Sequence, residues 1–212
     1  QNRSEMSPDA HSEIEALVSK AITLDPGLGE AYVMRATLDE DAGRAEADFR
    51  KGLELSPSYG LGYTYFAESL FRWNRNEEAQ LVFDHAIQID PLSPRAPYMK
   101  ALVKLEAAGT VAATQEAEAL LLNVVAIDPD FTNALVRIGE IKGILYGDLA
   151  AGLSYMERAL RANPGAEWIV EDTMAMYSQL EDVPAMQSLA TLAGDHSWYA
   201  RLLLSGYAGD WR

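Results

Sequence analysis

Residues 58–91 read SYGLGYTYFAESLFRWNRNEEAQLVFDHAIQIDP and contain two apolar patterns of helical period with a polar stretch between them. Apolar residues of the first pattern recur at i, i+3, i+4 and i+7 and so share one helix face, namely Tyr63, Phe66, Ala67 and Leu70. The second pattern alternates small and large residues before a terminal Asp-Pro, with Ala79, Phe83 and Ala86 as its apolar positions. The segment therefore predicts two helices that pack against each other.

Prolines divide the rest of the chain at similar intervals. Five of them follow Asp, Ser or Asn just after an apolar helical stretch: Pro26, Pro57, Pro91, Pro129 and Pro164. Their spacings are 31, 34, 38 and 35 residues. Because proline removes a backbone donor and clashes with the preceding helical turn, each one is expected to end a helix. A period near 34 residues predicts a repeated two-helix unit.

The segment 58–91 resembles the tetratricopeptide repeat family. Its first helix has the family's aromatic, large apolar, small and large apolar positions, and its second has alanine, aromatic, alanine and proline. Unit 27–57 keeps most of these positions but has Gly52 for the second alanine and an expected shortened turn over 41–44. Unit 92–129 is expected to have an enlarged loop over 108–110, and unit 130–164 has one extra residue. The resemblance implies an all-α fold, a right-handed superhelical solenoid of antiparallel helix pairs.

The resemblance covers nearly the whole chain, which is expected to form a single array over residues 1–212. The expected units are 12–26 (second helix only), 27–57, 58–91, 92–129, 130–164, 165–196 and 197–212 (incomplete). A chain that starts at Gln1 with half a unit and ends in another is expected to be part of a longer array. Truncated ends that expose apolar faces would allow an artefactual dimer through Trp198, Leu202 and Trp211, and the sequence leaves the oligomeric state open.

The charge composition limits the kinds of partner that the chain is expected to bind. Lys and Arg total 17 against 32 Asp and Glu, so the net charge is −15, which disfavours nucleic acid and favours a basic or amphipathic protein segment. No apolar run is long enough to predict a membrane span. The chain has no cysteine, which excludes disulfides and thiolate chemistry. Both the bacterial periplasm and the cytoplasm remain open as compartments.

By resemblance to the family, a groove for the partner is lined by first-helix residues that do not serve the core. The helical period projects a mixed acidic and apolar set toward it: Glu30, Val33, Thr37, Thr64, Tyr65, Glu68, Met99, Val103, Asn133, Val136, Arg137, Glu140, Trp168, Glu171 and Asp172. This mixture suits an extended or amphipathic peptide. The alternative is a solvated face on an acidic chain, with Tyr65 and Met99 packed on the adjacent repeat. Val33, Thr37 and Tyr65 cannot supply the charged donors with which some family members clamp chaperone C-termini.

Residues for other chemistry are few. The three histidines, His11, His85 and His196, lie far apart and lack ligands at a metal-binding spacing. Gly60 and Gly62 lack the lysine and hydroxyl of a phosphate loop. Adjacent carboxylates such as Glu77 and Glu78 point apart on a helix. The sequence thus predicts no catalytic, cofactor or metal site, and no enzyme.

Two functions follow from the resemblance. The first is a protein-interaction scaffold that holds a peptide or protein segment in its groove. The alternative is a regulatory or sensor segment of a larger signalling protein, because the helix that ends at Pro26 looks like the C-terminal repeat regions of bacterial membrane-associated regulators. Such proteins carry a winged-helix or nucleotide-cyclase domain before the array. A third hypothesis, an enzyme that uses carboxylates in a cleft, is kept only because such carboxylates cannot be identified from sequence.

Overall fold

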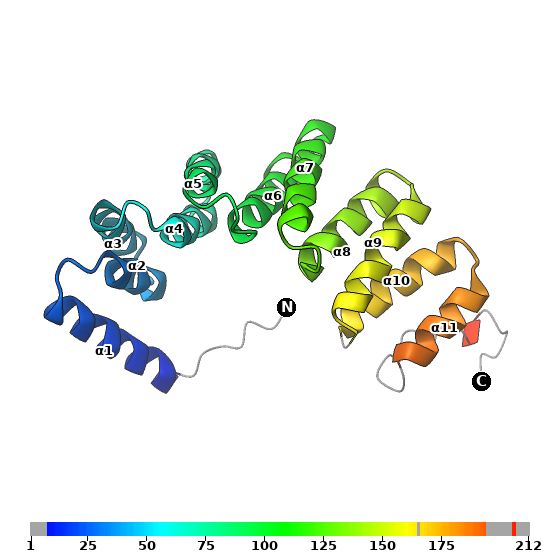
Figure 1. Ribbon diagram of the computed structural model, residues 1–212, viewed down its shortest axis with the longest axis horizontal. Coiled ribbons are helices and arrows are strands. Elements are labelled where there is room, and N and C mark those ends of the chain that lie inside the picture. Colours follow the sequence, from blue (N-terminus) through cyan, green and yellow to red (C-terminus); the bar gives the residue numbers. More distant parts are fainter. Residues whose placement is uncertain (1–7, 165, 194–204, 207–212) are drawn as a thin grey trace. The chain divides into compact units, whose positions relative to one another are not determined.

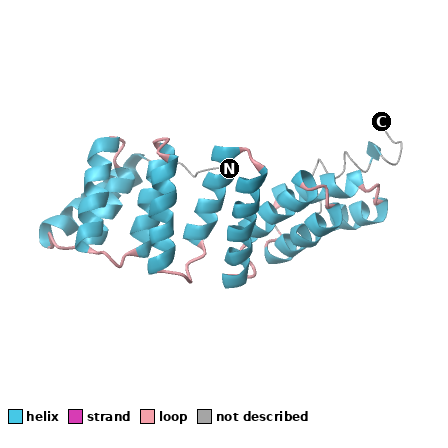
Figure 2. Cartoon of the chain, turned by 90° about the horizontal axis from the view of Figure 1, so that it is seen from above, coloured by secondary structure: helices cyan, strands magenta, loops and turns pink. Residues whose placement is uncertain are grey.

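The structure is a computed structural model that describes residues 8–164, 166–193 and 205–206. The described residues form helices joined by loops, without a strand (Figure 1, Figure 2). Contacts within the chain divide it into two compact units, residues 1–108 and 109–212. The division falls inside the unit expected over 92–129, between its two helices. The extension of one continuous array over the whole chain stays a prediction.

The first unit contains six helices within its described residues: α1 (Pro8–Leu24), α2 (Gly29–Leu38), α3 (Ala42–Leu55), α4 (Gly60–Arg72), α5 (Asn76–Ile89) and α6 (Arg95–Ala108). The described part of the second unit contains α7 (Val111–Ile127), α8 (Thr132–Glu140), the π-helix η1 (Ile141–Leu145), α9 (Leu149–Ala162), α10 (Glu167–Gln179) and α11 (Val183–Ala193). Helices α2, α4, α6, α8 with η1, and α10 are called first helices, and α3, α5, α7, α9 and α11 second helices. The expected helix from Ser197 and the dimer residues Trp198, Leu202 and Trp211 lie outside the described residues.

The prolines end helices as the sequence predicts. The residue before each proline leaves the helix, and its N–H still bonds the carbonyl four residues back, as from Ser56 to Gly52 at 2.9 Å and from Asp128 to Val124 at 2.8 Å. Its carbonyl then accepts the N–H three residues on, as from Tyr59 to Ser56 at 3.0 Å. The same bond follows Asp25, Asp90, Asp128 and Asn163. Each proline therefore stands at the second position of a β-turn, where its fixed φ is favourable.

Alternation of large and small side chains builds the core of each hairpin. In the first unit, Phe49 of α3 stacks on Phe66 of α4 with ring centroids 5.1 Å apart, and both are buried. Ala45 and Ala67 are also buried in this core. First helices also contact one another, α2 with α4 and α4 with α6. The predicted all-α fold of stacked helix pairs is thereby confirmed within each unit.

Unequal unit lengths are absorbed by the helices and not by the turns. The turn over 39–41 is three residues long, and so is the turn over 73–75. The difference lies in the first helices, because α2 has 10 residues and α4 has 13. The expected shortened turn over 41–44 is therefore wrong. The enlarged loop over 108–110 is also wrong, because only 109–110 separate α6 from α7, and α7 has 17 residues against 14 in α5.

The extra residue of unit 130–164 lies in the π-helix η1. The N–H of Tyr146 bonds the carbonyl of Ile141 five residues back, at 3.0 Å. A π-turn holds one residue more than an α-turn, so it accommodates a single insertion without ending the helix. Gly147, at φ +74°, then starts the return of the chain into α9.

Candidate functional site

Four of the side chains projected toward the groove lie in the core. Val33 and Val103 are fully buried, and Thr64 and Val136 are 2% exposed. A first helix packs on its own second helix and also on the neighbouring first helices, so its buried arc is wider than a one-sided amphipathic projection predicts. The prediction that these four side chains line an accessible groove is therefore wrong.

The remaining candidates of the first unit lie on α2, α4 and α6. Arg95 joins two of these helices, because its Nε donates to Glu68 at 2.9 Å and its Nη2 donates to the same carboxylate at 3.1 Å. The same guanidinium lies 5.2 Å from the centroid of the Tyr65 ring. Arg95 was not among the predicted groove residues. Since it neutralises Glu68 and covers one face of Tyr65, this part of the surface has fewer free groups than the sequence indicates.

The other first-unit candidates are only partly accessible. Met99 packs against the core, and Thr37 donates its hydroxyl to the carbonyl of Met34 at 2.7 Å. Burial raises the pKa of Tyr59, and nearby Tyr65 and Glu30 raise it further. Glu30 thus lies near an aromatic pair in which Tyr59 keeps its proton. Met34, 37% exposed, is an apolar side chain of α2 that the projection missed.

In the second unit the candidates form an acidic group with one arginine. Arg137 donates to Glu140 at 2.8 Å on α8. Burial raises the pKa of Asp172 on α10, and the charges of Glu140 and Glu171 raise it further while Arg137 lowers it. The carboxylates near Asp172 therefore make its ionised form less favourable. We call Arg137, Glu140, Glu171 and Asp172 the acidic cluster.

An exposed tryptophan lies on the same helix as part of this cluster. Trp168 is 43% exposed and stands three residues before Glu171 on α10, so the two side chains lie on neighbouring positions of one face. Asn133, at the start of α8, is exposed as well. The second unit therefore presents an indole and several carboxylates on its first helices.

The histidines and carboxylates are the remaining candidates for other chemistry. No three His, Cys, Asp or Glu side chains among the described residues form a group that could hold a metal ion. His85 packs edge-on against Tyr63 with ring centroids 4.5 Å apart, and His196 lies outside the described residues. No helix of the described residues is long and apolar enough to cross a membrane.

Stacked helix pairs closed by prolines define the class, which is that of helical-repeat proteins. Neither protein-family models nor curated protein sequences match this chain. Solved structures do match: PilW, a type IV pilus biogenesis factor, has 20% identity, a TM-score of 0.69 and coverage of 96% of this chain and 89% of its own. PilF of Pseudomonas aeruginosa has 19% identity and a TM-score of 0.65, with coverage of 94% and 86%.

YrrB, described as a TPR protein with an unusual peptide-binding site, has 20% identity, a TM-score of 0.60 and coverage of 91% of this chain and 97% of its own. These structures identify the fold of the chain as the tetratricopeptide repeat, as the sequence predicted. At this identity the likeness shows the fold alone. The alternative of a segment from a larger signalling protein stays a prediction.

Proposed function

We propose that this chain is a protein-interaction scaffold and that its first helices bind a segment of another protein. The observation that carries the proposal is the exposed indole of Trp168 beside the acidic cluster of α8 and α10. Large exposed aromatic side chains are enriched among residues that dominate binding energy at protein interfaces. The fold agrees with this proposal, since YrrB, which shares it, is described as having a peptide-binding site.

The charge of the cluster indicates the chemistry of the partner. Arg137 pairs with Glu140, and the raised pKa of Asp172, caused by burial and by the charges of Glu140 and Glu171, indicates that its negative charge is costly where it stands. A lysine or arginine of a partner would relieve this cost, and its apolar stem could pack on Trp168. The net charge of −15 attracts the same kind of partner over longer distances. The expected ligand is a basic, amphipathic peptide segment.

The first helices of the first unit carry candidate residues of their own. Glu30, Thr37, Met34 and Met99 remain candidates there, while Tyr65 and Glu68 are already engaged by Arg95. Met34 and Met99 offer apolar contacts and Glu30 a carboxylate, so we expect these residues also to favour an amphipathic segment.

The test begins with selection of peptides from a random library against the purified chain, followed by measurement of Kd by calorimetry. Selected peptides should carry Lys or Arg beside an apolar residue. Trp168→Ala and Glu171→Gln should each weaken binding, by roughly tenfold for the tryptophan.

Leu81→Ala, which truncates a 70%-exposed side chain on the second helix α5, is the control and should leave the Kd unchanged. The proposal fails if no peptide is selected. It fails equally if binding persists in Trp168→Ala and Glu171→Gln, both folded by circular dichroism.

A further inference from the structure

Three consecutive apolar side chains are exposed where the π-helix of the second unit ends. Ile144, Leu145 and Tyr146 are 63%, 62% and 42% exposed. Among the other described residues, exposed large apolar side chains occur singly along the sequence. Single exposed apolar residues are ordinary, but a run of three favours unwanted association and is expected only where it serves binding. The run is therefore a candidate interaction surface.

The backbone gives the register for comparing this run with other hairpins. A residue of positive φ lies in the turn after each of α4, η1 and α10, namely Asn74, Gly147 and Glu181. In this register Leu145 corresponds to Arg72 of the first unit and to Gln179 of α10. All three side chains are exposed, so the repeat does not require an apolar residue at this position. Only the hairpin with the π-helix places a leucine there.

The two positions beside Leu145 also differ between the units. In the first unit they are Phe71 and Trp73, which are partly buried and pack against the core. In the second unit they are Ile144 and Tyr146, which are exposed. The run in the second unit thus does not contribute to the core as its counterpart does, and its apolar surface remains available to a partner.

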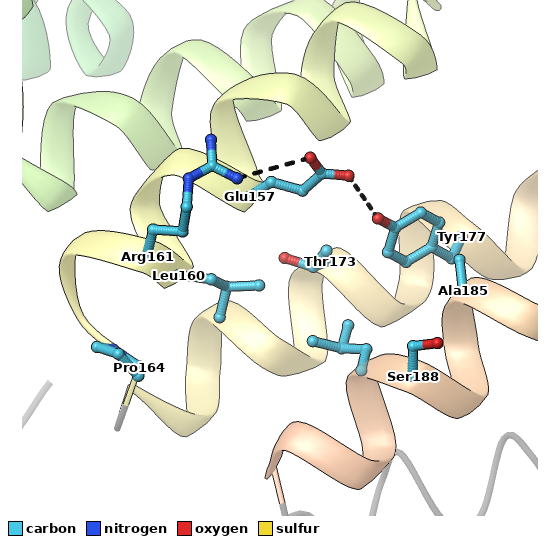
Figure 3. Close-up of a pocket in the computed structure, with 9 residues that line it drawn as sticks. Glu157, Leu160, Arg161, Pro164, Thr173, Tyr177, Ala185 and Ser188 are labelled. Atoms are coloured by element: carbon cyan, nitrogen blue, oxygen red, sulfur yellow. Dashed lines mark hydrogen bonds and ion pairs between the residues drawn. The ribbon is translucent and has the colours of Figure 1, made fainter.

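A fourth exposed apolar side chain, Leu180, follows α10 and is 48% exposed. A Cβ added at Gly143 of η1 would lie 3.0 Å from the terminal methyl of Met176, so η1 and α10 touch one helical turn before their ends. Tyr177 donates to Glu157 of α9 at 2.6 Å and holds the last turn of α10 in place (Figure 3). We call the following four residues the turn patch: Ile144, Leu145, Tyr146 and Leu180.

Carboxylates flank the turn patch. Asp148 precedes α9, and Glu181 and Asp182 precede α11. Both aspartates accept backbone N–H groups of the helices that they precede, at 3.0 and 3.1 Å, and remain exposed. None of the described cationic side chains pairs with these three carboxylates, and Lys142 of η1 is engaged by Glu118 at 2.6 Å. The surroundings of the turn patch are therefore negative and complement a cationic partner.

We propose that the turn patch docks an amphipathic helix of another protein that carries lysine or arginine beside its apolar face. Packed helices such as η1 and α10 have axes about 8–10 Å apart, and apolar residues seven positions apart on a helix span about 10 Å. One apolar side of the partner can therefore cover both Leu145 and Leu180, while its cations face Asp148 and Glu181. A second copy of this chain would instead bring like charges together.

This docking site is separate from the site proposed above. Trp168 stands at the start of α10, twelve residues before Leu180, which corresponds to about 18 Å along the helix axis. The inference does not rest on the binding of a peptide near Trp168.

The experiment measures Kd by fluorescence anisotropy with a labelled helical peptide of about 14 residues that has leucine on one face and lysine on the other. A second peptide carries glutamate in place of every lysine. All chains are full length and carry Trp168→Ala and Glu171→Gln, which remove the other proposed site, so the two proposals are tested separately. The lysine peptide should bind, and the glutamate peptide should bind at least about tenfold more weakly.

Leu145→Arg should weaken binding of the lysine peptide about tenfold, because it places a cation in the middle of the turn patch. The first unit has Arg72 in this register, so the variant should fold, and Leu180→Gln gives a second variant that should also weaken binding. The matched control is Leu81→Arg, the same change of charge at a 70%-exposed leucine of α5, which should leave the Kd unchanged.

The proposal is overturned if the lysine peptide does not bind or if the glutamate peptide binds as tightly. It is also overturned if Leu145→Arg and Leu81→Arg, both folded by circular dichroism, have the same Kd. A dimer in analytical ultracentrifugation that Leu145→Arg dissociates would assign the turn patch to a second copy of the chain and would overturn it as well.

Discussion

Arg75 pairs with two carboxylates of the first unit. It precedes α5 and donates to Glu78 at 2.7 Å on that helix, and it also donates to Glu46 at 2.5 Å on α3. Glu46 accepts a further bond from Arg50 at 2.6 Å. Arg75, and then Arg50, lower the pKa of Glu46 below its usual value of 4.5, against the opposing effect of burial. One carboxylate thus links two successive second helices.

Glu46→Gln removes this charge at nearly constant shape. We expect a Tm lower by roughly 2 °C at pH 7, because part of the pairing is exposed to solvent and contributes little. A depressed folded-state pKa contributes stability that is present above pH 4.5 and is lost as pH falls through the folded-state value. The difference from the native chain in scanning calorimetry should therefore shrink below pH 4.5. A difference that grows in acid would contradict the assignment.

At the scale of the helices, the sequence predicted the two-helix repeat better than it predicted the lengths of the individual helices and turns. Asp-Pro, Ser-Pro and Asn-Pro steps were read correctly as helix ends, because proline acts locally and needs no tertiary context. The sequence did not show which helix or turn holds the missing or added residues. The spacing between prolines would be the same whether a helix or a turn changed in length, and the structure shows a shorter α2, a longer α7 and a π-turn at 141–145. Only the packing of each hairpin distinguishes these solutions.

Two glycines determine how closely α2 and α3 pack. A Cβ added at Gly52 would lie 2.6 Å from the carbonyl oxygen of Gly29 and 2.8 Å from a methyl of Val33. This explains why glycine stands where α5 and α9 have alanine, at Ala86 and Ala159.

Gly52→Ala should destabilise the chain by about 2 kcal/mol, since the backbone oxygen of Gly29 cannot move aside without displacing its helix. Urea unfolding followed by circular dichroism measures this. Gly43→Ala is the matched control in an exposed part of α3, where the nearest atom to a new Cβ is a side-chain oxygen of Asp41 at 3.3 Å. A Gly52→Ala variant as stable as Gly43→Ala would refute the close approach.

The candidate surface was predicted less completely than the fold. Trp168 is exposed and Glu171 is partly exposed on α10, so their role in binding stays a prediction, whereas Val33 and Val136 belong to the core. Whether Val136 or Asn133 is buried depends on the neighbouring hairpin, and a single helix pattern does not encode that. Arg95 was missed because its role depends on Glu68 and Tyr65 of another helix.

For the whole molecule, the dominant electrostatic property is the net charge of −15. Self-repulsion of this size destabilises the folded state, and salt screens it. Raising NaCl from about 10 to about 150 mM should increase the Tm by a few degrees in scanning calorimetry. Sucrose at matched osmolarity controls for general cosolute effects. A lower Tm in salt would mean that ion pairs such as Arg75–Glu46 outweigh the repulsion.

The π-helix at 141–145 has a consequence for how such a molecule can change over generations. The inserted residue widens one helical turn, and Gly152 of α9 still packs closely against Gly139 of α8. A Cβ added at Gly152 would lie 2.8 Å from the carbonyl oxygen of Gly139. A gain of one codon is therefore contained within a single hairpin. Individual repeats can therefore gain a residue during evolution while the following hairpins keep the register of their packing.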